Sequence, residues 1–426
     1  MIRKKVILVG VLLSLAAVCA GAHGPQMENE QDAALRQVQG PRMQSEQIAH
    51  GQQTVQGPQE IQGLGLHPVQ EPAGSPLEVK HGPWVTAVGE DGFTVLWVTD
   101  EPGLAWVELQ DGRRFYHEFA GRRIFERLHS VKVSGLEPGK AYGYSVGCAP
   151  LKDDSHPRDP KFFPEKSSSG YCVKTFDNAS RTCAFAVFND IHCDLPRYRA
   201  FASSLDSQVF DFLFLNGDIA TAGNYSLDTL LHYELESLEG RSANLPVFFS
   251  RGNHEGRGNN PRLLSQIYPS STGNFYYAFR QGPVAFVVLD GGETSEKRSI
   301  AYCGKPAFED YIMEQMAWLK KLAREPWFRR AKQRICMIHV PMIDIGEEYN
   351  LQLWLNKHCI KALNEAGITL MISADLHEFQ FHEAGTMGNR FPILVNDDDT
   401  RVEVFCKDRG WSLRCFDKNG KETFSR

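Results

Sequence analysis

The sequence predicts two folded regions, an all-β sandwich followed by an α/β domain in which β-sheets are flanked by helices. The first region has short alternating runs of apolar and polar residues broken by turns, which is the period of half-buried strands. The second region alternates strand-length apolar runs with amphipathic helical stretches. With 426 residues, 42% of them hydrophobic, the chain can bury more than one core.

The first 22 residues predict a secretory signal peptide. Basic residues at positions 3–5 precede an apolar run over 6–20, which ends in Ala20-Gly21-Ala22. This run is short for a membrane span, and the small residues suit cleavage before His23. We expect an exported protein (periplasmic, cell-surface or secreted) with no stable membrane span after cleavage. An uncleaved anchor is the alternative.

Residues 23–76 predict a linker, because they are rich in Gln, Gly, Pro and Glu and have no sustained apolar period. Residues 77–178 predict the sandwich, with strands such as 84–88 and 93–98 separated by turn residues. Leu136-Glu137-Pro138-Gly139, followed by Tyr142 and Tyr144, resembles the tyrosine corner of fibronectin type III-like domains. The resemblance implies a fibronectin type III-like module with a structural role.

Residues 181–426 predict the α/β domain. An apolar stripe with spacings of three and four predicts one helix from Phe308 to Leu322, and a second helix is predicted over 350–365. Six apolar runs predict buried strands: Ala184–Phe188, Phe210–Leu215, Val247–Ser250, Val284–Leu289, Arg334–Ile338 and Ile368–Ser373.

Charge and cysteine spacing argue against a duplex nucleic-acid surface and against a cysteine-based framework or metal site. The formal net charge of −6 argues against a broad basic surface for duplex nucleic acid. The cysteines show no spacing typical of a disulfide framework or a metal knuckle. Cys183, Cys193 and Cys336 lie in or beside apolar runs and are expected to be buried thiols, whereas Cys406 and Cys415 could bridge a terminal hairpin.

Polar residues of metal-binding types follow most of the predicted strands. Each group alone is a weak signal, but five in order, each at a strand end, indicate a site, because ligands of open α/β sheets gather at the carboxyl ends of strands. The groups are Asp190-Ile191-His192, Gly217-Asp218, Gly252-Asn253-His254-Glu255, His339 and Asp375-Leu376-His377.

This order of motifs resembles the calcineurin-like metallophosphoesterase family, whose pattern is Asp-x-His, Gly-Asp, Gly-Asn-His-Asp/Glu, a lone His and Gly-His-x-His. The match spans roughly residues 183–400. Because a sandwich precedes it, the chain is most similar to the purple acid phosphatase branch, which carries a fibronectin type III-like domain before the catalytic one.

The resemblance implies a dinuclear metal centre that activates water for in-line attack on phosphorus. Asp190, His192 and His377 would bind the first metal, Asn253 and His339 the second, and Asp218 both. Carboxylate oxygens can join two cations about 3.5–4 Å apart. His254 would protonate the leaving oxygen or stabilise its charge, and Glu255 would orient the loop.

Oxygen and imidazole ligands suit divalent or trivalent manganese, iron, zinc or magnesium, and the sequence does not choose among them.

Arg251 and Arg257 flank the Asn-His pair, and their guanidinium groups could receive a phosphate. Solvated loop arginines are an equal alternative for both. Arg257 lies between two glycines, so we expect its loop to be mobile unless a ligand orders it.

Two positions depart from the family pattern. Asp375 stands where the family has a second-metal histidine, which makes the site one charge more negative and less attractive to dianionic phosphate. We therefore expect the second site to favour manganese or magnesium over zinc and monoanionic diesters to compete well with monoesters. A second possibility is that Asp375 is no ligand, which leaves a mononuclear or dead site.

Thr221 stands where purple acid phosphatases place an iron-binding tyrosine, so no metal-phenolate colour is expected from that position.

The sequence thus predicts an exported metal-dependent hydrolase of small phosphate esters, a phosphatase. A phosphodiesterase acting on nucleotides or lipid head groups uses the same residues. A non-catalytic binding protein with a degenerate metal site is the alternative from another class. Protein partners are not indicated.

Overall fold

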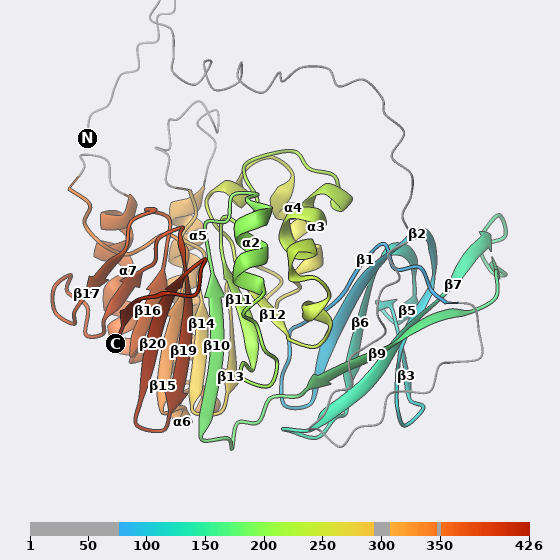
Figure 1. Ribbon diagram of the computed structural model, residues 1–426, viewed down its shortest axis with the longest axis horizontal. Coiled ribbons are helices and arrows are strands. Elements are labelled where there is room, and N and C mark those ends of the chain that lie inside the picture. Colours follow the sequence, from blue (N-terminus) through green and yellow to red (C-terminus); the bar gives the residue numbers. More distant parts are fainter. Residues whose placement is uncertain (1–75, 294–306, 347–350) are drawn as a thin grey trace, which may run out of the picture. The chain divides into compact units, whose positions relative to one another are not determined.

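The computed structural model describes residues 76–293, 307–346 and 351–426 (Figure 1). The predicted signal peptide and all but the last residue of the predicted linker lie outside these residues. None of the helices in the described ranges combines the length and apolar composition needed to cross a membrane.

Strands build the described chain from residue 76 to residue 178. They are β1 (His81–Thr86), β2 (Gly92–Leu109), β3 (Arg114–Tyr116), β4 (Glu118–Phe119), β5 (Arg122–Arg123), β6 (Phe125–Ser134), β7 (Ala141–Asp153), β8 (Lys161–Phe162) and β9 (Lys166–Lys174). The long strand β2 pairs with four strands: with β1 along its first half, with β3 and β7 along its second half, and with β6 in both. The β2–β6 pairing shifts register between Val98 and Gly103.

Both halves of β2 contribute to one buried cluster, which contains Val95 from the first half and Val107 from the second. The region is thus built largely of strands, seven of which are hydrogen-bonded into one sheet, and the sandwich stays a prediction. The hydroxyl of Tyr142 accepts a hydrogen bond of 2.8 Å from the backbone N–H of Glu137, which is the contact expected of the predicted corner. The fibronectin type III identity of the region stays a prediction.

The α/β region contains all six predicted strands, each within two residues of its predicted bounds, and both predicted helices. Its elements are β10 (Thr182–Phe188), α2 (Leu195–Ala202), β11 (Phe212–Asn216), α3 (Leu227–Leu235), η1 (Glu236–Leu238), η2 (Arg241–Ala243), β12 (Val247–Ser250), η3 (His254–Gly256), α4 (Asn260–Ile267), β13 (Tyr277–Gln281), β14 (Val284–Val288), α5 (Phe308–Leu322), α6 (Pro326–Arg330), β15 (Gln333–Met337), α7 (Leu351–Ala366), β16 (Leu370–Ser373), β17 (Gln380–His382), β18 (Ile393–Val395), β19 (Thr400–Lys407), β20 (Gly410–Asp417) and β21 (Glu422–Ser425).

The strands form two mixed sheets, whereas strand–helix alternation alone is typical of a mostly parallel sheet. One sheet has the order β12-β11-β10-β19-β20-β21 and the other β13-β14-β15-β16-β18-β17. Within each sheet the predicted strands run parallel. The first sheet is mixed because the C-terminal strands β19–β21 pair antiparallel to β10 and to one another. The second sheet is mixed because β13 pairs antiparallel to β14 and β17 pairs antiparallel to β18.

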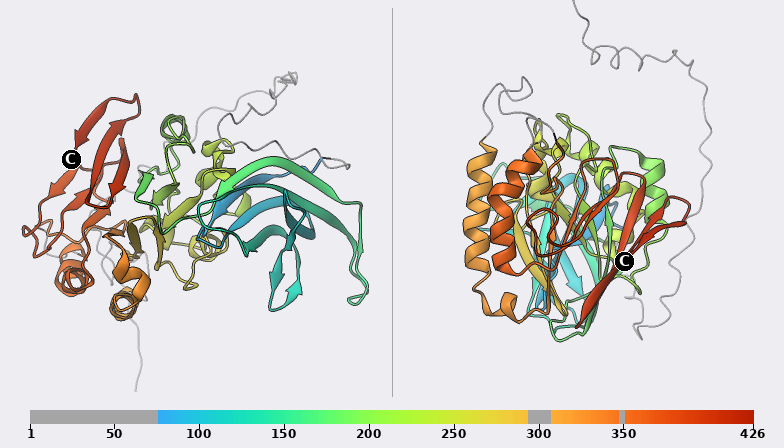
Figure 2. Two further views of the ribbon diagram at one scale, coloured as in Figure 1. Left: turned by 90° about the horizontal axis from the view of Figure 1, so that it is seen from below. Right: turned by 90° about the vertical axis from the view of Figure 1, so that its left-hand side faces the viewer.

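Four layers result from the packing of these sheets. Apolar side chains of the two sheets, such as Phe212 and Phe286 with ring centroids 5.2 Å apart, meet in a common core. Helices α2, α3 and α4 cover the outer face of the first sheet. Helices α5 and α7 cover the second, and Figure 2 shows this orange pair side by side. The loops that follow the parallel strands of both sheets lie at the carboxyl ends of those strands, and they carry the predicted site residues.

The strand-built region is joined to the α/β region by buried contacts. The indole N–H of Trp84 donates to the carbonyl of Ile267 at 2.9 Å, and the hydroxyl of Tyr144 donates to the carbonyl of Ala243 at 2.7 Å. The cluster that fills the first region also continues between the two sheets.

The suggested bridge between Cys406 and Cys415 is wrong. Both thiols are free and buried. Cys406 lies opposite Trp411 in the β19–β20 ladder and Cys415 lies opposite Val402, so the hairpin register keeps them apart. Cys183 and Cys336 are buried thiols, as predicted, while Cys193 is only partly buried.

Candidate metal centre

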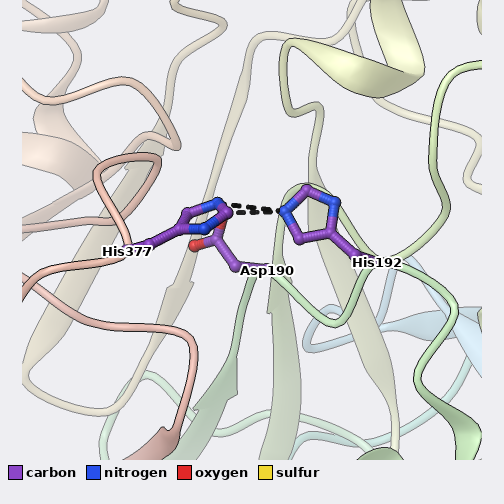
Figure 3. A group of neighbouring side chains, drawn as sticks. All are labelled: Asp190, His192 and His377. Carbon is purple, nitrogen blue, oxygen red and sulfur yellow. Dashed lines mark hydrogen bonds and ion pairs between the residues drawn. The ribbon is translucent and has the colours of Figure 1, made fainter. Parts of the chain in front are cut away.

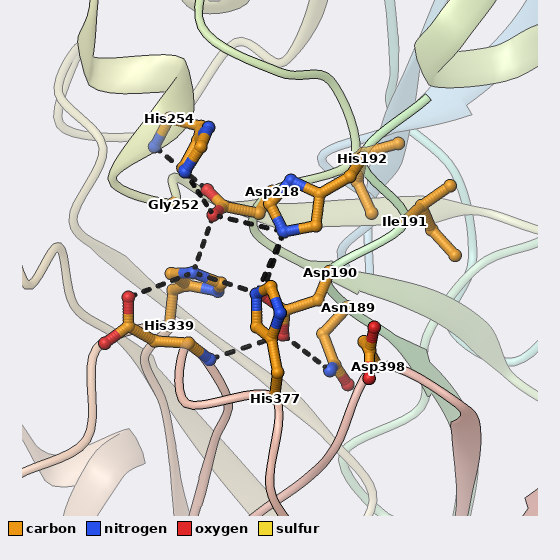
Figure 4. Close-up of polar contacts among 12 residues, drawn as sticks. Asn189, Asp190, Ile191, His192, Asp218, Gly252, His254, His339, His377 and Asp398 are labelled. Carbon is orange, nitrogen blue, oxygen red and sulfur yellow. Dashed lines mark hydrogen bonds and ion pairs between the residues drawn. The ribbon is translucent and has the colours of Figure 1, made fainter. Parts of the chain in front are cut away.

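Loops that follow five strands bring the predicted side chains together. Asp190 and His192 follow β10, Asp218 follows β11, and Asn253 and His254 follow β12. His339 follows β15, and Asp375 and His377 follow β16, so the second sheet supplies the remainder. Figure 4 shows the side chains of both sheets pointing toward one another.

Backbone geometry explains how these loops aim their side chains inward. Left-handed φ angles are rare for residues other than glycine and store strain. In the described chain six of the nine non-glycine residues with positive φ lie in these loops: Asp190, His192, Cys193, Asp218, Asp375 and His377. In the loops after β10, β11 and β16 these turns direct carboxylate and imidazole side chains toward the site.

Two glycines leave the room that the side chains occupy. A Cβ on Gly252 would lie 2.0 Å from Oδ1 of Asp218. A Cβ on Gly217, which has a φ of +83°, would lie 2.6 Å from the ring of His339. Glycine in Gly-Asp and Gly-Asn-His is thus a steric requirement of this chain.

The first cluster of ligand atoms joins Asp190, His192 and His377 (Figure 3). The Nε2 atoms of the two histidines are 3.1 Å apart, and Nε2 of His377 is 3.4 Å from Oδ1 of Asp190. The carboxylate is fully buried, whereas the two rings are partly exposed. Asn189 fixes the carboxylate by donating to its Oδ2 at 2.8 Å.

Asp218 is common to the other two clusters, one with His192 and His254 and one with Asp190 and His339. Its Oδ2 lies 3.8 Å from Nε2 of His192, 3.9 Å from that of His254 and 3.4 Å from that of His339. Its Oδ1 accepts the backbone N–H of His254 at 3.0 Å. A single oxygen of Asp218 therefore faces all three imidazoles.

His339 tests whether a cation fits. Its Nδ1 lies 2.7 Å from the carbonyl of Asn216 and must donate a proton to it, so Nε2 faces the site. Nε2 is fully buried and makes no hydrogen bond within the described residues, yet it lies within 4 Å of Asp190, Asp218 and Asp375. A buried imidazole nitrogen aimed at several carboxylates lacks a partner that a metal ion supplies.

The pKa values report the same excess of negative charge. Burial opposes protonation of His339, but Asp218 and Asp190 outweigh it and raise its pKa well above the ordinary value. Burial raises the pKa of Asp375 to about 6, and the charges of Asp190 and Asp218 add to the rise. The side chains as folded thus favour a bound cation, either protons or metal ions.

Asp375 faces the site despite its departure from the family pattern. Its Oδ1 lies 3.9 Å from Nε2 of His339, and its side chain is 6% exposed. Its Oδ2 accepts a hydrogen bond of 3.0 Å from the amide of Gln352 on α7. The Asp375 carboxylate therefore points toward the other candidate metal ligands.

His254 lies at the rim of the site. Its side chain is 31% exposed, and its ring packs edge-on against His192 with centroids 4.9 Å apart. Burial lowers the pKa of His254, and the charge of Asp218 opposes the shift. Asn253 is buried in the preceding loop position, at the start of η3.

Glu255 holds this loop from beneath, as the sequence suggests. Its buried carboxylate accepts the backbone N–H groups of Gly252 at 3.0 Å, Asp218 at 2.9 Å and Ile219 at 2.7 Å. It thereby ties the loop after β11 to the loop after β12.

The two predicted phosphate-binding arginines are both engaged with carboxylates. Arg251 is buried and lies 2.6 Å from Asp290, with its guanidinium over the ring of Phe275. Arg257 donates from Nε and Nη2 to Glu293, each at 2.8 Å. Neither is a solvated loop arginine. The hydrogen bond with Glu293 raises the pKa of Arg257, and the charges of Asp218 and Asp375 add to the rise, so Arg257 lies near the metal ligands.

Sequence reasoning missed the residues that hold the ligands in place. Asn189 and Asn216 each precede a recognised motif by one or two positions and could have been found as polar residues at strand ends. Arg197 donates to the carbonyls of Asp190 and Ile191 and pairs with Asp398, but nothing in its sequence context marks it. Gln352 is likewise unmarked.

Residues 184–379 match the family model for calcineurin-like phosphoesterases. This part of the chain is a calcineurin-like phosphoesterase domain. The structure is similar to purple acid phosphatase PPD1 from yellow lupin (Lupinus luteus) seeds, with a TM-score of 0.55 and 13% identity over 80% of this chain and 73% of that one.

The structure has a lower similarity to GAP50, the anchor in the inner membrane complex of Plasmodium. The TM-score is 0.44, with 14% identity over 58% of this chain and 88% of the other. No curated protein matches the sequence. The likeness to the lupin phosphatase at 13% identity is one of fold. The calcineurin-like phosphoesterase domain therefore stands on the family match, and its His and Asp clusters could bind metal ions.

Proposed function

We propose that the protein is an exported, metal-dependent hydrolase of small phosphate esters that holds two metal ions at the candidate centre. The observation that carries the proposal is the meeting of three clusters of ligand atoms, in two of which Asp218 takes part. Two bound cations would activate water and neutralise charge on the phosphate. The predicted signal peptide supports export.

Each ligand has a proposed role that fits its place. Asp190, His192 and His377 would hold one cation, and Asn253, His339 and Asp375 the other. Asp218 would contribute to both sites, since its Oδ2 lies within 4 Å of the imidazoles of His192 and His339.

His254 is proposed to serve the leaving group. Its backbone N–H is fixed by Asp218, and its ring stands at the exposed rim beside His192, where an ester can approach. From there it protonates the departing oxygen or stabilises its charge. Arg257, held in the same region by Glu293, receives a substrate phosphate.

The layout of the rest of the chain follows the same proposal. Residues 77–178 form a fibronectin type III-like module and residues 181–426 the catalytic domain. The substrate is a small molecule and not duplex nucleic acid, since the net charge of the chain is −6.

Asp218→Asn tests the function. Elemental analysis should find two metal ions per wild-type chain after incubation with manganese, iron, zinc and magnesium. The variant should lose metal, and turnover of a panel of phosphate esters should fall at least about 100-fold, the upper range for changes merely adjacent to a metal. Asp154→Asn, at an exposed position, is the control. Turnover of no ester by the wild-type chain, with one ion or none bound, would favour a non-catalytic binding protein.

A preference for diesters is the second candidate, and Asp375 favours it. With Asp190 and Asp218 it places three carboxylates around the proposed cations, which weakens attraction for a dianionic monoester more than for a monoanionic diester. Asp375→His should raise the monoester-to-diester rate ratio and shift the second ion from manganese or magnesium toward zinc. Unchanged metal content and an unchanged ratio would refute this charge argument.

A further inference from the structure

Gln352 lies next to Asp375 and forms a hydrogen bond with only one of its two carboxylate oxygens. The Gln352 side chain, on the first turn of α7, is buried, and its amide Nε2 donates to Oδ2 of Asp375 at 3.0 Å. Oδ1 of Asp375 is left on the side of His339, 3.9 Å from its Nε2. One oxygen is therefore occupied by α7 and the other is presented to the site.

The neighbouring ligands fix the same choice. The backbone N–H of Asp375 lies 3.3 Å from Oδ2 of Asp190, and the left-handed φ of +74° at Asp375 sets the direction of its side chain. A carboxylate whose second oxygen accepts a hydrogen bond from an amide has one unengaged oxygen to offer a cation, as an imidazole has one nitrogen. Asp375 with Gln352 thus presents one donor atom at a position where the family pattern has one histidine.

We propose that Gln352 is a positioning residue that makes Asp375 a single-oxygen ligand of the second metal ion. The inference rests on the proposed function, because it needs two metal ions at the centre. Gln352 acts through Asp375 and has no contact of its own with substrate in this arrangement.

The test is a manganese titration of the metal-free, full-length protein, in which the electron spin resonance signal of free Mn²⁺ reports binding. Gln352→Met keeps the length of the side chain and removes its N–H donor. We expect this variant to keep the tighter site and to weaken the second by about 10- to 100-fold, as changes behind a metal ligand do. Asn356→Leu is the matched control, because Asn356 is on the same helix and bonds only the carbonyls of Met342 and Met387 among its described contacts.

A double-variant cycle separates positioning from mere support of α7. In an Asp375→His background Gln352 has lost the carboxylate it holds, so Gln352→Met should then change the second affinity by less than about threefold. An equal loss in both backgrounds, or a loss matched by Asn356→Leu, would show that Gln352 only supports the helix.

The outcomes also distinguish this inference from the proposed function. If wild type and Gln352→Met each bind two manganese ions, and the second ion binds both proteins equally tightly, the inference is wrong and the proposed dinuclear centre is retained. One ion or none bound by wild type would overturn both.

Discussion

At the scale of single residues, the site depends on the absence of a side chain at Gly252. A methyl group there would lie 2.0 Å from Oδ1 of Asp218 and 2.6 Å from a carboxylate oxygen of Glu255. Because both acids are buried and held by backbone N–H groups, neither can move aside without breaking those bonds. The glycine of this loop is therefore coupled to the position of the shared ligand.

Gly252→Ala should lower the free energy of unfolding by about 1–3 kcal/mol, as overpacking does, and should weaken metal binding. Urea denaturation and a manganese titration measure the two effects. Gly256→Ala in the same loop is the control, since a Cβ there would meet nothing within 4 Å. Similar losses in both variants would show that the loop is merely intolerant of substitution.

The residues that sequence reasoning found and missed differ in kind. The ligand types at five strand ends were visible because acid and imidazole side chains stand out against apolar runs. Asn189, Arg197 and Gln352 were not, because a donor that braces a carboxylate is recognisable only when the fold shows which oxygen it meets. The ion pairs of Arg251 with Asp290 and of Arg257 with Glu293 were likewise not visible, because the acids lie far away in the sequence.

At the scale of elements, Glu255 joins the loops that follow β11 and β12. Its carboxylate accepts N–H groups on both loops, including those of Asp218 and Gly252. No other described side chain accepts from both of these backbone groups. The relative position of the two loops thus depends on a buried acid that the proposed chemistry does not consume.

Glu255→Gln should cost about 1–3 kcal/mol of unfolding free energy, because an amide has one acceptor oxygen and leaves a buried N–H without its bond. Metal binding should weaken with it. Thermal denaturation and elemental analysis measure this, and Glu365→Gln, at an exposed acid, serves as control. A melting temperature equal to that of wild type would mean that water replaces the lost acceptor.

Element types were predictable and sheet membership was not. The apolar runs gave β10–β12 and β14–β16 within two residues, because buried parallel strands are continuously apolar. Their division between two sheets depends on β19–β21 and on which faces meet, and the local period of a strand carries no such information.

At the scale of the whole molecule, the strand-built region carries two buried histidines that bear on stability. His129 is fully buried between Trp97 and Thr99, with Nε2 2.8 Å from the threonine hydroxyl, and His117 packs edge-on against it. Burial lowers the pKa of His117 to about 4. Burial, with a smaller effect of His117, lowers that of His129 to about 3. Both rings stay neutral in the folded chain at neutral pH.

Acid should therefore destabilise the fold through this pair. An unfolded histidine binds its proton near pH 6.5, whereas the folded rings bind theirs only near pH 4 and 3. As the pH falls through this window the unfolded chain takes up more protons, so the free energy of unfolding decreases, and it recovers as the pH rises. Urea denaturation between pH 7 and pH 4 should show a smaller decrease in the double variant His117→Gln and His129→Gln than in wild type. The exposed His156→Gln is the control, and an equal decrease in all three proteins would place the acid sensitivity elsewhere.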